Sequence, residues 1–330
     1  MEIKFSSCIP ITDESSVGEA RRTGLLAAQR VGLDDVKAGQ FALLATEVCR
    51  NVLRHGGGGE AIITSHNNGN GPVGRIVALD RGSGIQDITK ALDDGYSTGG
   101  TLGMGLGSMK RNARCFEIFT AQTGTIVFLE VGDKPANRLQ IAGLAVPYPG
   151  ERVCGDAWAY HESPERTLIF LADGLGHGVQ AAEAADEAVK LFRKHVERAP
   201  AAILSYVHDG LKKTRGAAAA VAEIVHSAQA LTYAGVGNTA AVILSKRVSR
   251  SLVSHNGTLG MLAPKFQEFR VPWPEDGILI MHSDGVQTKW DLSAYPGMLA
   301  RHAAIIGGVL LRDFRRKRDD ASVVVAKAKM

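Results

Sequence analysis

The sequence predicts an α+β protein of two domains, and three observations support this prediction. The chain has 330 residues, which is enough for two separate hydrophobic cores. Segments with the apolar period of a helix and short apolar runs typical of strands occur in both halves. A polar stretch with a glycine and a proline, residues 133–138, separates the halves and is the predicted linker. We therefore expect one domain over residues 1–132 and another over residues 139–330.

Two helices are predicted early in the first domain. The spacing Ser16-x-x-Glu19 is that of a capping box and predicts a helix that ends at Gly32. A second helix is predicted over residues 36–54, with the aspartate at position 34 or 35 as its cap. Its apolar residues recur at helical spacing and form a buried stripe of Phe41, Ala45, Val48 and Val52.

Strand-like runs complete both domains. In the first they cover residues 61–65, 75–80, 116–121 and 125–131, and a further helix is predicted over residues 108–114. Helices on one antiparallel or mixed sheet make an α/β sandwich. In the second domain we expect a helix over residues 179–196, and strands over 167–172, 230–234, 240–244, 277–282 and 322–326.

Composition and charge exclude several classes of protein. The net charge is only +4, and we interpret the single dense basic run, residues 312–318, as a solvated helix face, so nucleic acid is not an expected partner. The four cysteines show no C-x-x-C pair, which argues against a zinc site or a disulfide framework. No signal-peptide core and no apolar run of about 18 residues is present, so we expect a cytoplasmic protein without a membrane segment.

A first group of motifs has the chemistry of a nucleotide site. Glu47 and Asn51 are four residues apart and share one helix face, where Asn offers an oxygen to Mg²⁺ and Glu can accept a proton. Asp80 ends an apolar strand and could accept a hydrogen bond from an amino group such as that of adenine. Gly82 and Gly84 behind it permit close approach of the backbone to a ligand. Taken singly, these motifs also fit a solvated helix face and a tight strand-exit turn.

A glycine loop follows these motifs. Gly103, Gly105 and Gly107 lead into the helix at 108, where backbone N–H groups can hold an anion, and Lys110 and Arg111 could reach phosphates. The loop matches neither the Rossmann nor the Walker pattern, and alone it would fit a flexible loop. The occurrence of all three motifs in this order predicts a nucleotide pocket.

A second group of motifs is acidic. Asp156, Asp173, Asp284 and Asp319 each lie at the end or edge of a predicted strand, mostly beside a glycine. One such pair is usually a turn. If the four carboxylates converge, each pair at about 4 Å costs roughly 4 kcal/mol at an effective dielectric constant near 20, so bound cations are needed. Oxygen ligands favour Mg²⁺ or Mn²⁺ over zinc, and two such ions can activate a water for attack on phosphorus.

The nucleotide motifs resemble the Bergerat-type ATPase fold of histidine kinases and anti-sigma serine kinases. The stretch from DDGYST at residues 93–98 through Lys110 and Arg111 is especially similar to the RsbT-type serine kinases of partner switching, and the resemblance covers residues 1–132. It implies ATP and Mg²⁺ as cofactors and small STAS-domain proteins as substrates. It also implies that Glu47 is the general base, that Asn51 binds Mg²⁺ and that Asp80 binds adenine. The residues that would shape the pocket, its lid and its phosphate contacts are Gly82, Gly84, Gly103, Gly105, Gly107 and Lys110.

The acidic motifs resemble the metal-dependent PPM phosphatases of the SpoIIE type, and most closely the compact RsbX-like members. The similar segments are VCGDAWAY, LIFLADGLGHG, LTYAGVGNTAAVIL, ILIMHSDGV and RDDASVVVAK, within residues 139–330. The resemblance implies an αββα sandwich that binds two Mg²⁺ or Mn²⁺ ions. The implied ligands are Asp156, Asp173, the Gly174 carbonyl, Asp284 and Asp319, with Asp320 as the alternative to Asp319. His177 would lie near the metals as a neighbouring or substrate-contacting residue, or as a proton donor.

Three functions remain open at this point. The first is a bifunctional regulator that phosphorylates a Ser or Thr of a STAS-domain protein and dephosphorylates that protein or a related one. In the second, the phosphatase is joined to a nucleotide-gated binding module without kinase activity. In the third, the first domain is an anti-sigma module that binds a sigma factor.

Overall fold

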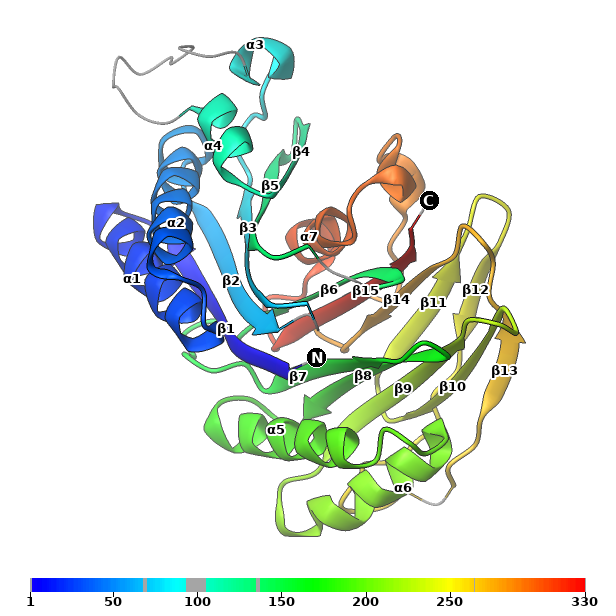
Figure 1. Cartoon of the computed structure of the whole chain (residues 1–330). Helices are drawn as coiled ribbons and strands as arrows, with labels where there is room; N and C mark the ends of the chain where they lie inside the picture. The colour runs from blue at the N-terminus through cyan, green and yellow to red at the C-terminus, as the bar shows by residue number, and fades with distance from the viewer. Residues whose placement is uncertain (1, 68–69, 93–104, 135–136, 264, 330) are drawn as a thin grey trace. The chain divides into compact units, whose positions relative to one another are not determined.

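The chain divides into two compact units, residues 2–136 and 137–330. The computed structural model describes residues 2–67, 70–92, 105–134, 137–263 and 265–329. Within these ranges no helix is both long and apolar enough to cross a membrane. Each unit has its own sheets and covering helices, so each is described separately (Figure 1).

The N-terminal unit is one antiparallel sheet covered by two long helices on one face. The strand order is β1-β2-β3-β5-β4, and helices α1 and α2 pack on β1, β2, β3 and β5 (Figure 1). This arrangement confirms the predicted α/β sandwich. The strands are β1 (Glu2–Ile11), β2 (Gly59–Asn67), β3 (Pro72–Asp80), β4 (Cys115–Ala121) and β5 (Gly124–Gly132). The helices are α1 (Glu14–Val31), α2 (Asp35–Gly56), α3 (Ile88–Leu92) and α4 (Leu106–Asn112).

The two long helices begin after aspartate N-caps and end at glycine C-caps, and the start of the first differs from the prediction. The predicted capping box at Ser16 is wrong by one turn, because Asp13 is the N-cap of α1 and accepts a hydrogen bond from the Ser16 N–H at 2.8 Å. The C-cap is Gly32, as predicted, and its φ of 88° favours glycine. The predicted stripe of α2 is fully buried at Phe41, Ala45 and Val48.

Strand β1 was not predicted. Its sequence, EIKFSSCIPI, breaks the alternation of a half-buried strand with a Ser pair and ends with a proline before its last residue. It is an edge strand, paired only with β2, and proline is tolerated there because one side of an edge strand donates no ladder hydrogen bonds.

The C-terminal unit consists of two five-stranded sheets between helices, which confirms the αββα sandwich. The first sheet has the order β13-β10-β9-β8-β7 and is covered by α5 and α6, and the second has the order β12-β11-β14-β15-β6 and is covered by α7. The sheets meet where Gly143 faces the Trp158 ring: a Cβ on Gly143 would stand 2.1 Å from that ring. The first sheet comprises β7 (Asp156–Glu162), β8 (Arg166–Gly174), β9 (Ala217–Val225), β10 (Ala230–Val236) and β13 (Phe269–Pro272). The second comprises β6 (Leu139–Val146), β11 (Ala240–Leu244), β12 (Ser249–Leu252), β14 (Ile278–His282) and β15 (Ala321–Ala328). The helices are α5 (Val179–Lys194), α6 (Pro200–Gly210) and α7 (Ala303–Phe314).

This unit contains elements that the sequence did not predict, and one interpretation of its sequence was wrong. The alanine run at 217–220, for which no strand was predicted, is the start of β9, where small side chains allow helices α5 and α6 to pack closely on the sheet. The basic run at 312–318 is not a solvated helix face. Arg312 is buried at the end of α7 and pairs with Asp313 at 2.7 Å, and only residues 316–318 are exposed.

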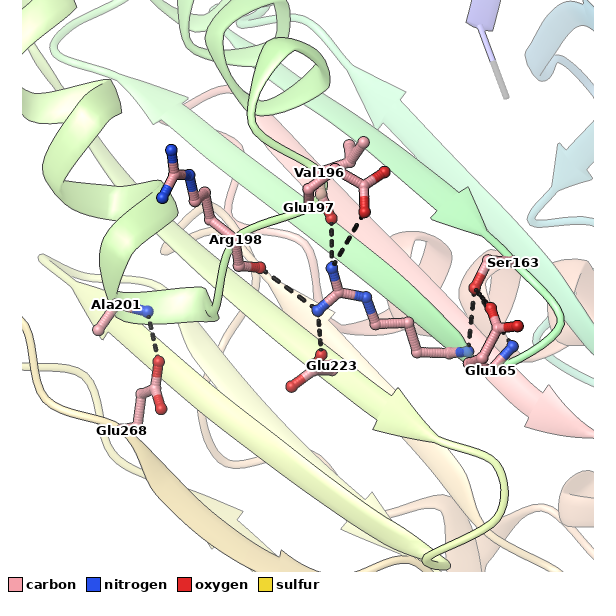
Figure 2. A network of polar contacts seen from close by, with 9 residues as sticks. Ser163, Glu165, Val196, Glu197, Arg198, Ala201, Glu223 and Glu268 are labelled. Carbon is pink, nitrogen blue, oxygen red and sulfur yellow. Dashed lines mark hydrogen bonds and ion pairs between the residues drawn. The ribbon is translucent and has the colours of Figure 1, made fainter.

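The connection between α5 and α6 is held by one arginine at the start of β8. Arg166 donates to Glu223 on β9 at 2.5 Å, to the Val196 carbonyl at 2.7 Å and to the Arg198 carbonyl at 3.4 Å (Figure 2). A second contact holds the first turn of α6, where the Ala201 N–H donates to Glu268 at 2.9 Å (Figure 2). These bonds fix the helical layer on the first sheet.

We expect Arg166→Ala to destabilise the C-terminal unit by about 2–3 kcal/mol, because Glu223 and two carbonyls lose a charged donor in a mostly buried place. Scanning calorimetry of the full chain should show a lower Tm for that unit. Arg247→Ala, an exposed arginine in the turn before β12, is the matched control and should leave the Tm unchanged. An equal loss in both variants would contradict the assigned role.

Candidate active sites

The first candidate site begins on helix α2. Glu47 and Asn51 lie one turn apart on this helix, as predicted, and Glu47 is buried whereas Asn51 is half-buried. The Glu47 carboxylate is not free. Its Oε1 accepts a hydrogen bond from Arg50 Nη1 at 2.9 Å. Sequence reasoning missed this partner, although the i, i+3 spacing of Glu47 and Arg50 is the one at which helical side chains meet.

Asp80 lies beside the end of the same helix. It is the last residue of β3, and its Oδ1 accepts hydrogen bonds from the N–H groups of Gly82 at 2.9 Å and Thr125 at 3.0 Å. A Cβ on Gly56, at the end of α2, would stand 2.4 Å from the Asp80 Cβ. Helix α2 and Asp80 are therefore in direct contact, with Oδ1 engaged by the backbone.

The glycines after Asp80 serve the packing of the unit itself. A Cβ on Gly82 would stand 2.7 Å from the His55 carbonyl oxygen, and one on Gly84 would stand 2.3 Å from that of Ala121. These glycines were expected to let the backbone approach a ligand. In the structure they let it approach α2 and β4 instead. The φ of Gly84, 74°, adds a second requirement for glycine.

The glycine loop is described only from its last part. Gly103 and residues 93–98 lie outside the described residues. Gly105 is the N-cap of α4, with no side-chain cap, and Gly107 is buried in the first turn. Lys110 and Arg111 are exposed in the last turn of α4. The helix begins at Leu106, two residues earlier than predicted.

The second candidate site begins with two aspartates on neighbouring strands. Asp156, the first residue of β7, is the direct cross-strand partner of Asp173 near the end of β8. Asp156 is buried, and its Oδ2 accepts a hydrogen bond from Ser283 Oγ at 2.6 Å. The backbone N–H of Asp284 donates to the Asp173 carboxylate. The turn after β14 therefore meets both β7 and β8.

The two remaining aspartates meet in the same place. Asp284 Oδ2 accepts from Asn238 Nδ2 at 3.3 Å, and the Asp284 and Asp319 side chains share a hydrogen bond. Asp320 is buried, its Oδ1 accepts from the Tyr148 N–H at 2.8 Å, and its charge also acts on Asp156. Of the two adjacent acids, Asp319 is the one whose side chain contacts that of Asp284.

The electrostatics of this cluster fit divalent cations. Burial, followed by the charges of Asp320 and Asp319, raises the pKa of Asp156 to about 7. Burial, followed by the charges of Asp156, Asp284 and Asp319, raises the pKa of Asp173 to about 9. Across the described residues, no three His, Cys, Asp or Glu side chains already converge in metal-binding geometry, so the carboxylates meet pairwise. A bound Mg²⁺ or Mn²⁺ ion would offset the repulsion between these crowded carboxylates, and carboxylate oxygens are the ligands that both ions prefer.

This cluster predicts an unusual pH dependence of stability. Because the folded pKa values of Asp156 and Asp173 exceed the ordinary aspartate value of 3.8, which applies to the unfolded chain, their contribution to stability is fully present below that value. It is lost progressively as the pH rises above that value, and the loss is complete above about 7 for Asp156 and above about 9 for Asp173. In metal-free buffer, the contribution of these two aspartates to the Tm of the C-terminal unit should therefore fall as the pH rises through this window.

Mg²⁺ or Mn²⁺ should raise that Tm more above the window than below it. Scanning calorimetry across the pH range, with EDTA or with metal, measures both effects. A metal-induced rise in Tm that is equal on both sides of the window would contradict the assignment.

Two further residues that the sequence analysis named lie just after Asp173 in the chain. Gly174 follows Asp173 and is packed tightly, since a Cβ there would stand 2.1 Å from the Ala181 carbonyl oxygen. His177 is exposed, its Nδ1 lies 3.0 Å from Glu151 Oε1, and its ring stacks on Tyr148 at 4.3 Å. Sequence reasoning found His177 but neither partner, because both lie in the loop before β7, with no spacing signal to join them.

Comparison with known proteins identifies both units. A model of the histidine kinase-like ATPase domain matches residues 10–131, and a model of Stage II sporulation protein E (SpoIIE) matches residues 163–329, half of the chain. Serine/threonine-protein kinase RsbT of Bacillus subtilis (strain 168) is 34% identical over 105 residues, which cover 32% of this chain and 79% of RsbT. The chain belongs to the RsbT and SpoIIE families. It joins an RsbT-like serine/threonine kinase domain to a SpoIIE-type serine/threonine phosphatase domain.

Solved structures support the fold. One described as "The bacterial stressosome: a modular system that has been adapted to control secondary messenger signaling" is 27% identical, with a TM-score of 0.54 over 58% of this chain and 100% of its own. RsbX in complex with magnesium is 19% identical, with a TM-score of 0.51 over 59% of this chain and 98% of its own. The second likeness concerns the fold alone.

Proposed function

We propose that this chain is a bifunctional, cytoplasmic regulator of partner switching. Its RsbT-like domain, residues 1–132, transfers the γ-phosphoryl group of ATP to a Ser or Thr of a STAS-domain protein. Its SpoIIE domain, residues 139–330 after a linker at 133–138, removes the phosphoryl group from that protein or a related one. The observation that carries the proposal is the presence, in one chain, of a helix-borne Glu/Asn pair beside Asp80 and of four aspartates that meet pairwise.

In the kinase domain each residue has a separate task. Asn51 offers the oxygen that would hold the Mg²⁺ ion of Mg·ATP, and that ion neutralises phosphate charge when bound. Asp80 has its Oδ1 fixed by two backbone N–H groups, which leaves Oδ2 for the amino group of adenine. Glu47 accepts the proton of the attacking hydroxyl, and the hydrogen bond from Arg50 engages Oε1 of its carboxylate. Lys110 approaches the phosphates from α4.

In the phosphatase domain the aspartates carry the chemistry. Asp156, Asp173, Asp284, Asp319 and the Gly174 carbonyl would hold two Mg²⁺ or Mn²⁺ ions, which supply a hydroxide nucleophile when bound. Ser283 orients the Asp156 carboxylate through its 2.6 Å hydrogen bond, and Asn238 orients that of Asp284. His177 is held by Glu151, and we expect it to contact the phosphorylated substrate.

A mass-spectrometric assay tests the proposal. A STAS-domain protein is incubated with the Asp284→Asn chain, ATP and Mg²⁺, so that the phosphatase cannot remove the product. We expect a mass increase of one phosphoryl group on the STAS protein. Wild-type chain with Mn²⁺ and no ATP should then remove it. Absence of the first step would refute the kinase half, and absence of the second would refute the phosphatase half.

A second candidate is supported by one contact. Because Glu47 is paired with Arg50, the first domain could act as a nucleotide-gated binding module or an anti-sigma module that transfers no phosphate. In that case ATP would change the affinity for a STAS protein or a sigma factor without any mass change in either. Binding measurements with and without ATP distinguish the two candidates.

A further inference from the structure

Three loops of the SpoIIE domain meet beside Asp173. They are residues 174–179, 214–216 and 258–262, and we refer to them together as the rim loops. The Leu175 N–H donates to the Gly216 carbonyl at 3.0 Å, which joins the first loop to the second. Ala217 and Leu259 exchange backbone hydrogen bonds at 3.1 Å and 2.8 Å, which joins the second to the third. The first loop follows Asp173 directly, so the rim loops border the place where a phosphoryl group would be hydrolysed.

The rim loops expose large apolar side chains. Leu175 is 50% exposed and Met261 is 64% exposed. Both lie beside Gly216, because the Leu175 N–H bonds its carbonyl and the Met261 Cγ lies 3.4 Å from where a Cβ on Gly216 would stand. Val179 and Leu262 add two more, at 63% and 73% exposure. Single exposed apolar residues are common on protein surfaces, but four in adjoining loops are typical of a patch that binds another molecule.

The same loops carry an unpaired cation. Arg215 is exposed, and its Nη1 lies 3.2 Å from where a Cβ on Gly176 would stand. It forms no ion pair with any carboxylate in the described ranges of the chain, whereas the nearby Lys212 is paired with Asp209 at 2.7 Å. An arginine available in this position suits a phosphate or an acidic group on an incoming chain.

The first rim loop is also fixed in place. His177 is held between Glu151 and the Tyr148 ring, and the Tyr148 N–H is bonded to the buried Asp320. A loop anchored on both sides presents its side chains without a large loss of conformational entropy on binding.

We propose that the rim loops are the docking surface for the phosphorylated segment of the substrate protein. Leu175 and Met261 contact apolar side chains that flank the phosphoserine or phosphothreonine, and Arg215 contacts the phosphoryl group or an acidic residue beside it. This inference rests on the proposed phosphatase function, and it identifies the substrate class as phosphosegments with apolar neighbours. A membrane surface or a nucleic acid would need more cations than these loops offer.

Two synthetic phosphopeptides test the docking. One has leucine on each side of phosphoserine, and the other has serine in those places. With full chain and Mn²⁺, we expect kcat/KM for the leucine peptide to exceed that for the serine peptide by about tenfold, the effect of covering one or two apolar side chains. The double variant Leu175→Ser with Met261→Ser should bring this ratio close to one.

Matched controls separate docking from folding and from chemistry. Val248→Ser changes an exposed apolar residue, 46% exposed, in the turn between β11 and β12, which is at the other end of β14 from Asp284, and the preference should survive. Arg215→Ala should raise KM for both peptides several-fold, and Arg250→Ala on β12 should not.

The outcomes distinguish the two proposals. Failure of wild-type chain to hydrolyse p-nitrophenyl phosphate with Mn²⁺ would refute the phosphatase function itself. Hydrolysis of that compound without a preference for the leucine peptide would refute the docking surface alone. A preference that persists in the double variant, with an unchanged Tm, would also refute it.

Discussion

Asp173→Asn is expected to lower the phosphatase activity of the full chain by about 10³-fold or more while ATP-dependent phosphorylation of a STAS protein continues. Asp173 is the cross-strand partner of Asp156 and receives the backbone N–H of Asp284, so it lies between the other carboxylates. Replacing it with an amide keeps the size of the side chain and removes one negative charge from the metal-binding set. Hydrolysis of p-nitrophenyl phosphate with Mn²⁺ measures the loss.

The same variant should be more stable than wild type without metal. The pKa of Asp173 is raised to about 9 because burial and three neighbouring carboxylates oppose its ionisation, so at neutral pH the folded state carries an unfavourable group that Asn removes. We expect a higher Tm in EDTA and a smaller rise in Tm on adding Mn²⁺.

Asp186→Asn is the matched control. Burial also raises the pKa of Asp186, but this residue lies on α5 beside Lys190 and Arg193, away from the cluster. Its activity and its response to Mn²⁺ should equal those of wild type. If Asp173→Asn behaves like Asp186→Asn, the assignment of the metal site is wrong.

The two folds could be predicted from the sequence because their long elements follow simple periods. Helix α2 shows its buried stripe at helical spacing, and the central strands read as apolar runs. Edge strand β1 and strand β9 are among the elements that were missed, since neither β1 nor the alanine-rich start of β9 shows alternation. Arg312 was misjudged because a run of basic residues says nothing about which side chain faces the core, and here α7 buries its last turn.

The residue types of the sites could be predicted, but not their orientations. The sequence left Asp319 and Asp320 as alternatives, and only the backbone separates them: Asp320 faces the Tyr148 N–H and Asp319 faces Asp284. The glycines at 82 and 84 were expected to approach a ligand. In the fold they are needed because α2 and β4 already occupy the space of a side chain, a long-range contact that no local pattern encodes.

Glu47→Gln is expected to reduce phosphoryl transfer to a STAS protein by about 10²–10⁴-fold, the usual contribution of a general base, without loss of ATP binding. The assay uses the Asp284→Asn background, labelled ATP and Mg²⁺. Asn51→Ala should instead lose both transfer and Mg²⁺-dependent ATP binding, because it removes the metal-binding oxygen. Glu19→Gln, on the exposed face of α1, is the matched control and should change neither.

A loss of activity in Glu47→Gln would not reflect unfolding. The carboxylate is bound to Arg50, whose side chain is 41% exposed, and such a partly exposed helical ion pair contributes about 0.5 kcal/mol. The Tm should therefore barely change. If Glu47→Gln transfers phosphate at the wild-type rate, Glu47 is not the base. If wild type transfers none although ATP alters STAS binding, the Glu47–Arg50 pair belongs to a binding module, and the first domain acts by nucleotide-dependent association.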